Sequence, residues 1–381
     1  MQDNLNVLIT TSGIGSRLGE FTKFSNKCLV RIGDVPIITR IIESYNSDTN
    51  FYVTLGHNGD LVKQYLKIAH PSRSFVFIEV DKYEGKGSSL CYSLLKAEEH
   101  LQKPFIYHAC DTLTEKYIPS LEFNWCGAYQ KTNSSHYATL NIEGTNVKKI
   151  NPKGEINYDL EYIGLCGIKD YKLFWSKLRH FYKNSPNDTS LNDSIAINSM
   201  LLTTQFKVIK FNNWSDVGNI DSLNETRSLY PANHVVLDKD LEAIYFLNNK
   251  VIKFFKDQEI NKKRVERIEY LNKTTPKILN YSKNFYSYCY EKGDLAADVI
   301  NEKTIIELLN WVNDNLWSNK KELGIKAKNS CHNFYYVKTE KRVEAFLSQI
   351  NKNDGLDKIN GLLVPSVKKL MSSLEKDFLT N

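Results

Sequence analysis

Short apolar runs alternate with stretches of helical periodicity over the first hundred residues. Four runs rich in β-branched and aromatic residues predict strands at Asn6 to Thr11, Phe51 to Gly56, Phe75 to Val80 and Pro104 to Asp111. Between them, apolar residues from Ile37 to Tyr45 and from Leu90 to Leu101 recur at the spacing of one helix face. Alternating strands and helices predict an α/β fold with a Rossmann-like, mixed but mostly parallel sheet covered by helices on both faces.

The pattern loosens after Asp111. Shorter strand-like runs, such as Tyr162 to Ile168 and Phe206 to Phe211, are mixed with helical stretches and extend the first sheet. A polar helix ends at Pro231, and a strand-rich segment begins near Val235. We therefore expect one domain over residues 1–231 and a second over 232–381.

The second domain shows a different arrangement of elements. It begins with strands at Ala243 to Leu247 and Lys250 to Phe255, joined by Asn248-Asn249, a pair that suits a tight hairpin turn. A helix near Asn261 to Leu271 and two further strands, Lys277 to Leu279 and Phe285 to Tyr290, follow. The rest of the chain, from about Glu302, is predicted to be helical. This is an α+β pattern.

Composition indicates a globular protein and bears on its partners. With 381 residues, 41% hydrophobic and 25% charged, the chain is typical of a globular protein of two or three domains. The net charge of +6 is spread along the chain rather than clustered, which argues against nucleic acid as a partner and fits anionic small molecules.

Cysteine usage and hydropathy indicate a cytoplasmic setting. Seven cysteines lie far apart without C-x-x-C spacing, so we expect reduced thiols in the core. The N-terminus lacks a basic, apolar leader, and no apolar run reaches the ~18 residues of a membrane span. We expect no membrane insertion, and we leave open whether the protein forms a homo-oligomer.

The most informative stretch is a glycine turn, Thr10-Thr11-Ser12-Gly13-Ile14-Gly15-Ser16-Arg17-Leu18, followed by Ser25-Asn26-Lys27-Cys28-Leu29-Val30. Glycines without Cβ atoms let backbone N–H groups approach an oxyanion, and Arg17 and Lys27 supply positive charge. The stretch is neither a Walker A loop nor a dinucleotide G-x-G-x-x-G motif, because position 18 is Leu. A phosphate cradle and a plain strand-to-loop turn both fit.

Together with Arg17-Leu18 and Lys27-x-Leu29-Val30, the turn resembles the signature of the nucleoside-diphosphate-sugar pyrophosphorylase superfamily, which includes the phosphocholine cytidylyltransferases. The resemblance covers residues 6–230. The chain departs from the family in Thr10-Thr11-Ser12, where alanines are usual, and in Asn26, where proline is usual. The resemblance implies catalytic roles for Arg17 and Lys27. It also implies nucleotide binding by Thr10, Ser12, Gly13, Gly15 and Ser16.

Further stretches fall where that family places functional residues. The loop with Gly85, Gly87 and Ser88 stands at the family's base-binding loop, although Ser88 or Ser89 as an ordinary helix cap accounts for it too. Asp111 ends an apolar strand, where open α/β sheets bind ligands, and an Asp there also serves commonly as a helix cap.

The resemblance also implies a metal site and an acceptor site. Asp216, in Trp214-Ser215-Asp216-Val217-Gly218, matches a W-x-D-x-G segment and is implied as a Mg²⁺ ligand together with Asp111. Lys153 stands near the family's acceptor-phosphate lysine, and Glu161 in the zone of the acceptor's hydroxyl groups.

The implied reaction is nucleotidyl transfer, in which a phosphomonoester attacks the α-phosphorus of a nucleoside triphosphate and pyrophosphate leaves. A sugar 1-phosphate for surface-polysaccharide precursors and a phosphocholine-like acceptor both fit. Four aromatic residues could contribute to an ammonium site: Trp125, Tyr129, Tyr158 and Tyr162. Two other classes are a non-catalytic nucleotide sensor and a glycosyltransferase. The latter would want D-x-D at the strand end, where the chain has Asp111-Thr112-Leu113.

The second domain resembles the N-terminal lobe of choline/aminoglycoside-type kinases. Lys253 lies inside an apolar strand, and the resemblance implies that it holds ATP phosphates and pairs with Glu266 or Glu269 on the next helix. A half-exposed lysine that reaches water is the alternative. The H-G-D catalytic loop of that family does not occur in the chain. We therefore expect a lobe truncated before the catalytic loop, or one that only binds, without kinase activity.

Overall fold

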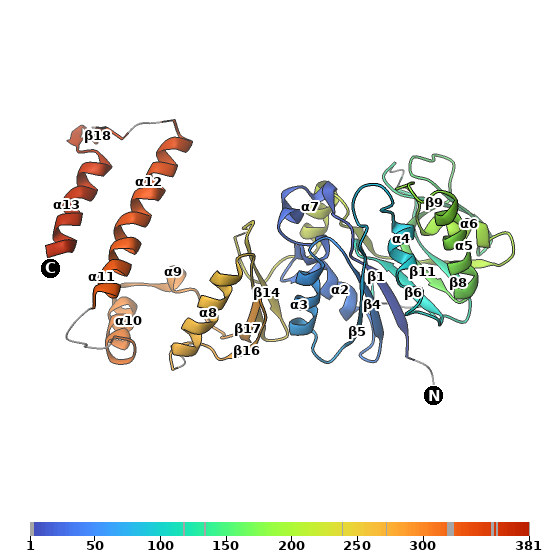
Figure 1. Ribbon diagram of the computed structural model, residues 1–381, viewed down its shortest axis with the longest axis horizontal. Helices are drawn as coiled ribbons and strands as arrows, with labels where there is room; N and C mark the ends of the chain where they lie inside the picture. Colours follow the sequence, from blue (N-terminus) through green and yellow to red (C-terminus); the bar gives the residue numbers. More distant parts are fainter. Residues whose placement is uncertain are drawn as a thin grey trace. The chain divides into compact units, whose positions relative to one another are not determined.

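The computed structural model describes residues 4–116, 119–132, 135–237, 239–271, 273–317, 324–351, 354–355 and 357–380. The chain forms two compact units, residues 1–293 and 294–381 (Figure 1). The boundary expected near Pro231 thus lies inside the first unit, between its two sheets. The first unit contains every residue of the predicted nucleotide site.

A nine-stranded mixed sheet forms the centre of the first unit, in the order β5-β4-β1-β6-β11-β8-β12-β10-β9. The strands at one end are parallel: β5 (Ser74–Glu79), β4 (Asn50–Leu55), β1 (Asn6–Thr10) and β6 (Phe105–Ala109). The others are β11 (Leu160–Ile168), β8 (Asn124–Tyr129), β12 (Phe206–Lys210), β10 (Asn146–Asn151) and β9 (Thr139–Glu143). β11 is antiparallel to both neighbours, and β9 and β10 form a hairpin, so the sheet is mixed as predicted but parallel mainly in its N-terminal half.

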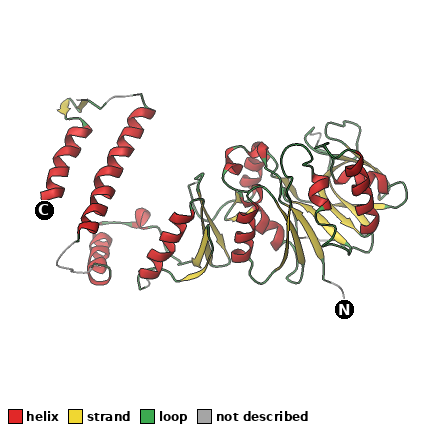
Figure 2. Cartoon of the chain, viewed as in Figure 1, coloured by secondary structure: helices red, strands yellow, loops and turns green. Residues whose placement is uncertain are grey.

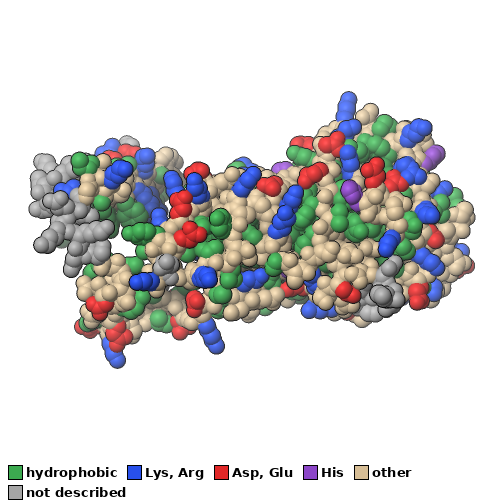
Figure 3. All heavy atoms as spheres, turned by 60° about the horizontal axis from the view of Figure 1, so that its bottom comes forward, with side chains coloured by type: hydrophobic (Ala, Val, Ile, Leu, Met, Phe, Trp, Pro, Cys, Tyr) green, Lys and Arg blue, Asp and Glu red, His purple; other side chains and the backbone are tan. Residues whose placement is uncertain are grey.

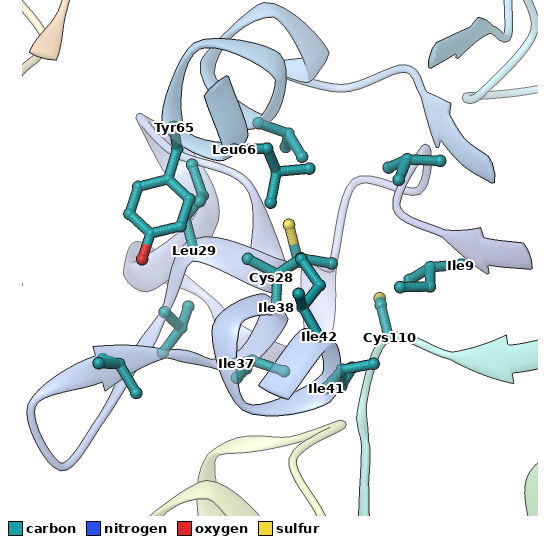
Figure 4. Packing of buried hydrophobic residues seen from close by; sticks show 14 of the residues in the cluster. Ile9, Cys28, Leu29, Ile37, Ile38, Ile41, Ile42, Tyr65, Leu66 and Cys110 are labelled. Carbon is teal, nitrogen blue, oxygen red and sulfur yellow. The ribbon is translucent and has the colours of Figure 1, made fainter. Parts of the chain in front are cut away.

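Helices cover both faces of this sheet (Figure 2). One core includes side chains of α2 (Ile37–Glu43) and α3 (Gly59–Ala69). The other includes side chains of α4 (Leu90–Leu95), α5 (Tyr171–Asn184) and α6 (Asp193–Met200). The isoleucines of α2 point into the first core, beside Ile9, Cys28 and Cys110 (Figure 4), and are at most 1% exposed. Each such side chain contributes roughly 1.5–3 kcal/mol through burial, which explains why their spacing predicted the helix.

A second, four-stranded antiparallel sheet follows in the order β14-β15-β17-β16. Its strands are β14 (Glu242–Leu247), β15 (Lys250–Phe255), β16 (Ile278–Tyr281) and β17 (Phe285–Cys289). Asn248 and Asn249 adopt φ angles of 47° and 61°, the left-handed pair that a tight hairpin requires. One face packs on α8 (Gln258–Tyr270), through Phe255 and Val265.

The other face of the small sheet shares the core of α2 and α3. Its buried members are Tyr245, Leu247, Ile252, Phe254 and Phe285. The Tyr65 ring of α3 lies 5.2 Å from the Tyr245 ring, centroid to centroid. The seam is also hydrogen-bonded: the backbone N–H of Asn284 donates to Gln64 Oε1 over 2.9 Å. The small sheet is therefore packed firmly against the α/β layer, which explains why the division of the chain falls after Gly293.

Short elements complete the first unit around the glycine turn. They are η1 (Ser16–Leu18), α1 (Glu20–Lys23), η2 (Lys27–Leu29), β2 (Arg31–Ile32), β3 (Val35–Pro36), β7 (Thr112–Thr114), β13 (Trp214–Asp216) and α7 (Ile220–Leu229). The antiparallel pair β7–β13 matters most for function, because it joins two segments about a hundred residues apart in sequence.

The second unit consists mainly of helices, as predicted. They are α9 (Ala296–Val299), α10 (Glu302–Asn315), α11 (Ile325–His332), the π-helical η3 (Asn333–Val337), α12 (Lys338–Gln349) and α13 (Val367–Thr380). A small hairpin of β18 (Asp357–Ile359) and β19 (Leu362–Val364) precedes α13.

Surface and cysteine chemistry agree in part with expectation. Charged side chains of both signs are scattered over the face seen in Figure 3. All seven cysteines are free; five are buried, whereas Cys289 is exposed and Cys331 is half-buried. In the part of the chain that the structure describes, no helix is both long enough and apolar enough to cross a bilayer.

Candidate active site

The glycine turn leaves the end of β1 and bends back under local constraints. Gly15 has φ 66°, a left-handed conformation that favours glycine, and it precedes η1. An added Cβ there would lie 3.0 Å from Thr22 Cγ2 and 3.1 Å from Lys27 Cβ. The hydroxyl of Thr22 donates to the Gly15 carbonyl over 3.2 Å. The glycine is thus required by both conformation and space, and the turn lies directly beside Lys27.

A cavity of about 780 Å³ opens over this turn and the adjacent strand ends. It is lined by most of the predicted site residues: Thr10, Ser12, Gly13, Gly15, Ser16, Arg17, Lys27, Gly85, Ser88, Asp111, Lys153 and Asp216. Gly87 packs instead against α5, where its carbonyl accepts from the Tyr182 hydroxyl over 3.2 Å. Ser89 caps α4 by accepting from the Tyr92 N–H, so the helix-cap interpretation holds alongside a cavity lined by Gly85 and Ser88.

Lys27 and Asp111 form an ion pair at the floor of the cavity. Lys27 Nζ donates to Asp111 Oδ2 over 2.5 Å, and the two side chains are 13% and 23% exposed. Burial alone would lower the pKa of Lys27, but the neighbouring negative groups together outweigh burial and raise it, chiefly the Asp111 carboxylate through its charge and hydrogen bond. Burial likewise disfavours the Asp111 carboxylate, and the Lys27 ammonium lowers its pKa nevertheless. Both groups are therefore charged at neutral pH.

Asp216 reaches the same place from β13. Its backbone lies opposite Thr112 in the β7–β13 pair, one residue after Asp111, and Val217 N–H donates to the Asp111 carbonyl over 2.9 Å. The Ser222 hydroxyl, in the first turn of α7, donates to Asp216 Oδ2 over 3.0 Å. Burial and the neighbouring Asp111 carboxylate raise the pKa of Asp216. Burial is the larger cause of that shift, and repulsion between the two neighbouring carboxylates adds to it.

Gly218 shows how closely the two carboxylates converge. A Cβ built on this glycine would lie 3.0 Å from Asp216 Oδ1, 3.2 Å from Asp216 Oδ2 and 3.3 Å from Asp111 Oδ2. Both carboxylates thus face one point beside the Gly218 backbone. Among the described residues, no group of three or more His, Cys, Asp and Glu side chains is arranged to hold a metal ion. An ion bound here would take oxygens from two carboxylates and its remaining ligands from substrate and water, as Mg²⁺ often does.

Arg17 and Lys153 are exposed side chains at the cavity. Partial burial and the charge of Arg17 lower the pKa of Lys153, while Asp111 and Asp216 act in the opposite direction. Arg17 in turn contributes to the lowered pKa of Asp111. The two cations and the two carboxylates therefore lie within electrostatic range of one another, in a cavity suited to an anionic ligand that also carries a cation.

Sequence reasoning missed a buried pair that also lines the cavity. The Tyr162 hydroxyl donates to Asp193 Oδ2 over 2.5 Å, and both residues line the cavity. Burial raises the pKa of Asp193. The one signal in the sequence was Asn192-Asp193-Ser194, in which Asn192 caps α6 by accepting from the Ser194 N–H. Nothing in that signal placed the helix start at the cavity.

Aromatic side chains also contribute to the cavity wall, and only one of them, Tyr162, is among the four expected from sequence. Tyr137 and Trp214 line it, with ring centroids 4.7 Å apart. Tyr129 packs behind Trp214 at 5.6 Å. Of the four aromatic residues proposed from sequence, only Tyr162 is among the lining residues in the described part of the chain. Trp125 lies in the core because its strand, β8, is central to the sheet.

Glu161 and Tyr158 are held away from the cavity. Glu161 is fully buried, and its Oε1 accepts from the Thr132 N–H, the Thr132 hydroxyl and the Tyr158 hydroxyl. The geometry fits a structural anchor rather than a group that meets an acceptor directly.

Lys253 and Glu266 are not brought together. Lys253 lies with its Nζ 5.7 Å from the centroid of the Tyr288 ring, and Glu266 is exposed on α8. Burial lowers the pKa of Lys253, and the positive charge of Arg264 is the next largest cause. No ion pair involving Glu266 or Glu269 occurs among the described residues.

Comparison with known proteins identifies a related sequence. The chain is 27% identical over 233 residues to a CTP:phosphoglutamine cytidylyltransferase from Campylobacter jejuni subsp. jejuni, an alignment that covers 55% of this chain and 90% of that relative. The chain is homologous to a nucleotidyltransferase. No protein-family model matches it.

Solved structures show the same nucleotidyltransferase fold. A UDP-glucose pyrophosphorylase aligns with a TM-score of 0.52 at 16% identity, over 60% of this chain and 98% of that one. A Bacillus anthracis structure described as a glucose-1-phosphate thymidylyltransferase aligns with a TM-score of 0.51 at 18% identity, over 62% of this chain and 98% of that one. The predicted α/β nucleotidyltransferase fold is thereby confirmed. The kinase-like interpretation of the second sheet stays a prediction.

Proposed function

We propose that the protein joins a nucleoside triphosphate to a phosphomonoester, releases pyrophosphate, and depends on Mg²⁺. The observation that carries the proposal is the convergence of Asp111 and Asp216 on one point, beside Lys27 and the glycine turn. A sensor that binds nucleotide without turnover has no need of two adjacent carboxylates, because their repulsion only costs stability.

Each group of the site has a task in this reaction. The backbone N–H groups of the glycine turn and Arg17 would hold the β- and γ-phosphates that leave, and Lys27 would stabilise charge near the α-phosphorus. The attacking phosphomonoester is already an anion at neutral pH, so no general base is needed, and catalysis rests on positioning and charge. Asp111 and Asp216 would hold a Mg²⁺ ion, which when bound offsets the negative charge of the reacting phosphates.

Two acceptor classes remain in view, and one observation favours the second. A sugar 1-phosphate would supply surface-polysaccharide precursors, as the family resemblance suggests. A phosphorylated nitrogen compound that carries a cationic group, such as phosphocholine, is favoured by the Tyr137–Trp214 wall, because aromatic faces attract cations. The name of the homologous cytidylyltransferase points the same way and makes CTP the first triphosphate to test.

A pyrophosphate-release screen tests the proposal. CTP, UTP, GTP and dTTP are each combined with Mg²⁺ and with sugar 1-phosphates, phosphocholine and phosphorylated amides, with a chelator as control. We expect release with one pairing, abolished by chelator and by Asp216→Asn. Tight triphosphate binding with no release across the panel would favour the sensor and refute the enzyme.

The small sheet and α8 add a weaker proposal. We propose that they are a kinase-like lobe in which Lys253 contributes to ATP binding. The strand order, with a helix between the second and third strands, is what supports it. A nucleotide titration of Lys253→Met tests it: if ATP affinity is unchanged, the lysine has no such role.

A further inference from the structure

Asn26 lies at the junction of three segments around the active site. Its side chain is fully buried, and its Nδ2 donates to the Thr11 carbonyl over 2.8 Å and to the His57 carbonyl over 2.7 Å. Its Oδ1 accepts from the Cys28 N–H over 3.0 Å. One amide therefore uses both donated hydrogens and one acceptor position to join the glycine turn, the β4–α3 loop and the start of η2.

Each of these bonds fixes a group that the site needs. The bond to Thr11 holds the residue at which the glycine turn leaves β1. The bond from Cys28 caps η2, which begins at Lys27, so it sets where the Lys27 side chain leaves the backbone towards Asp111. The bond to His57 adds a brace, because the His57 N–H itself donates to the Ser12 carbonyl over 2.9 Å. The glycine turn is thus held from two segments, by Asn26 before η2 and by His57 after β4.

We propose that Asn26 is a positioning residue that sets the spacing between the anion-binding glycine turn and the Lys27–Asp111 pair. The inference rests on the proposed function, in which the glycine turn and Lys27, the two parts that Asn26 links, bind the same triphosphate. It concerns the position where the chain departs from the proline of the resembling family. A proline has no side-chain donor and could make none of these three bonds.

A second buried asparagine, Asn284, lies elsewhere in the first unit and, like Asn26, donates to two backbone carbonyls and accepts through its Oδ1. Asn284 is 3% exposed, and its Nδ2 donates to the carbonyls of Phe255 and Lys256 over 2.8 and 3.0 Å. Its Oδ1 accepts from Gln64 Nε2 over 3.2 Å. It joins three segments as Asn26 does, but at the seam of the small sheet. Asn284→Ala is therefore a matched control for the loss of a buried, fully bonded amide.

The test compares Asn26→Ala, Asn26→Ser and Asn284→Ala in the full-length chain. Serine keeps an oxygen that can cap η2 but is too short to reach Thr11 and His57, so it separates bridging from capping. Steady-state kinetics with the active substrate pair and thermal melting are measured for each variant. We expect both Asn26 variants to lose roughly 10- to 100-fold in kcat/KM, as small displacements of reacting groups commonly do. Asn284→Ala should melt earlier with kcat/KM unchanged.

The outcomes separate this inference from the proposed function. If Asn26→Ser folds and turns over like wild type, Asn26 is not a positioning residue, whatever its effect on melting. If Asn26→Ala does not fold, Asn26→Ser alone decides. If the wild-type chain itself gives no transfer, the proposed function fails, and triphosphate affinity becomes the readout. In that case an unchanged dissociation constant in Asn26→Ser overturns the inference, and a weakening of about tenfold or more supports it.

Discussion

Gly218→Ala probes the point at which Asp111 and Asp216 converge. The added methyl carbon would lie 3.0 to 3.3 Å from three carboxylate oxygens. These contacts are tighter than those of most side chains, so one or both carboxylates must retreat by a few tenths of an ångström. The methyl group also fills the space towards which both carboxylates point.

The expected effect on activity is large and that on stability small. Mg²⁺ demands near-ideal geometry at ~2.0–2.1 Å, and a shift of ~1 Å in a reacting group can cost ~10²-fold. Because the displacement here is smaller than ~1 Å, we expect kcat/KM to fall by about tenfold and the Mg²⁺ concentration for half-maximal rate to rise. Crowding of this kind costs about 1–3 kcal/mol, offset in part by the ~0.4–1 kcal/mol that Gly→Ala gains through the unfolded chain.

The assay is pyrophosphate release as a function of Mg²⁺ concentration, with circular dichroism and melting to confirm folding. Gly324→Ala is the control, since a Cβ there meets no atom within 4 Å and the residue lies in the other compact unit. If folded Gly218→Ala stays within about threefold of wild type, with an unchanged Mg²⁺ requirement, the two carboxylates do not act on a shared ion.

Three further predictions address charge and pH. Lys27→Ala and Arg17→Ala should each fold and lose ~10²–10³ in kcat, the usual effect of removing a charge contact to the reacting centre; near-wild-type turnover in both would contradict their assignment. Asp216→Asn should abolish transfer yet raise the melting temperature at neutral pH, by on the order of 1 kcal/mol in stability. Its raised pKa means that the fold disfavours its charge, so this gain should shrink as pH falls towards that pKa, and a melting point that drops at pH 7 would refute the reasoning. Burial lowers the pKa of His108 to about 4, below the usual 6.5, so the unfolded chain binds more protons between these values. Stability should therefore fall as pH is lowered through this window, by up to ~1.4 kcal/mol per pH unit for this group, and urea midpoints should depend less on pH in His108→Gln.

Much of the fold was predictable because burial follows periodicity. The helix α2 and the strands around β1 could be predicted because their apolar side chains are buried in the core, so that the spacing of these residues follows the period of the element. The charged residues of the site were predictable for a different reason: Arg17 and Lys27 follow a glycine turn at characteristic spacing, and Asp111 ends a strand. What the sequence could not show was the β7–β13 pairing that places Asp216 beside Asp111, since such pairing depends on contacts between distant segments.

The misplaced residues share a cause as well. Trp125 was proposed for a binding wall, but an aromatic residue on a central strand is equally typical of core. The pairing of Lys253 with Glu266 depended on the rotation of α8 about its axis, which a helix with few apolar residues does not specify. One available signal went unused: Val251-Ile252 and Phe254-Phe255 are apolar on both faces of β15, which indicates a strand covered on both sides.

That doubly covered strand means the chain cannot be divided where its pattern changes. A fragment ending at Pro231 would uncover Tyr65, whose ring lies against Tyr245 and Phe285. It would also leave the carbonyl of Leu29, two residues after Lys27, without its bond from the Tyr245 hydroxyl. Such a fragment should aggregate through its exposed apolar surface, even though it retains every group proposed to contact the nucleotide. The small sheet therefore has a structural role apart from any binding: it permanently covers an apolar face of the α/β layer and keeps that layer folded.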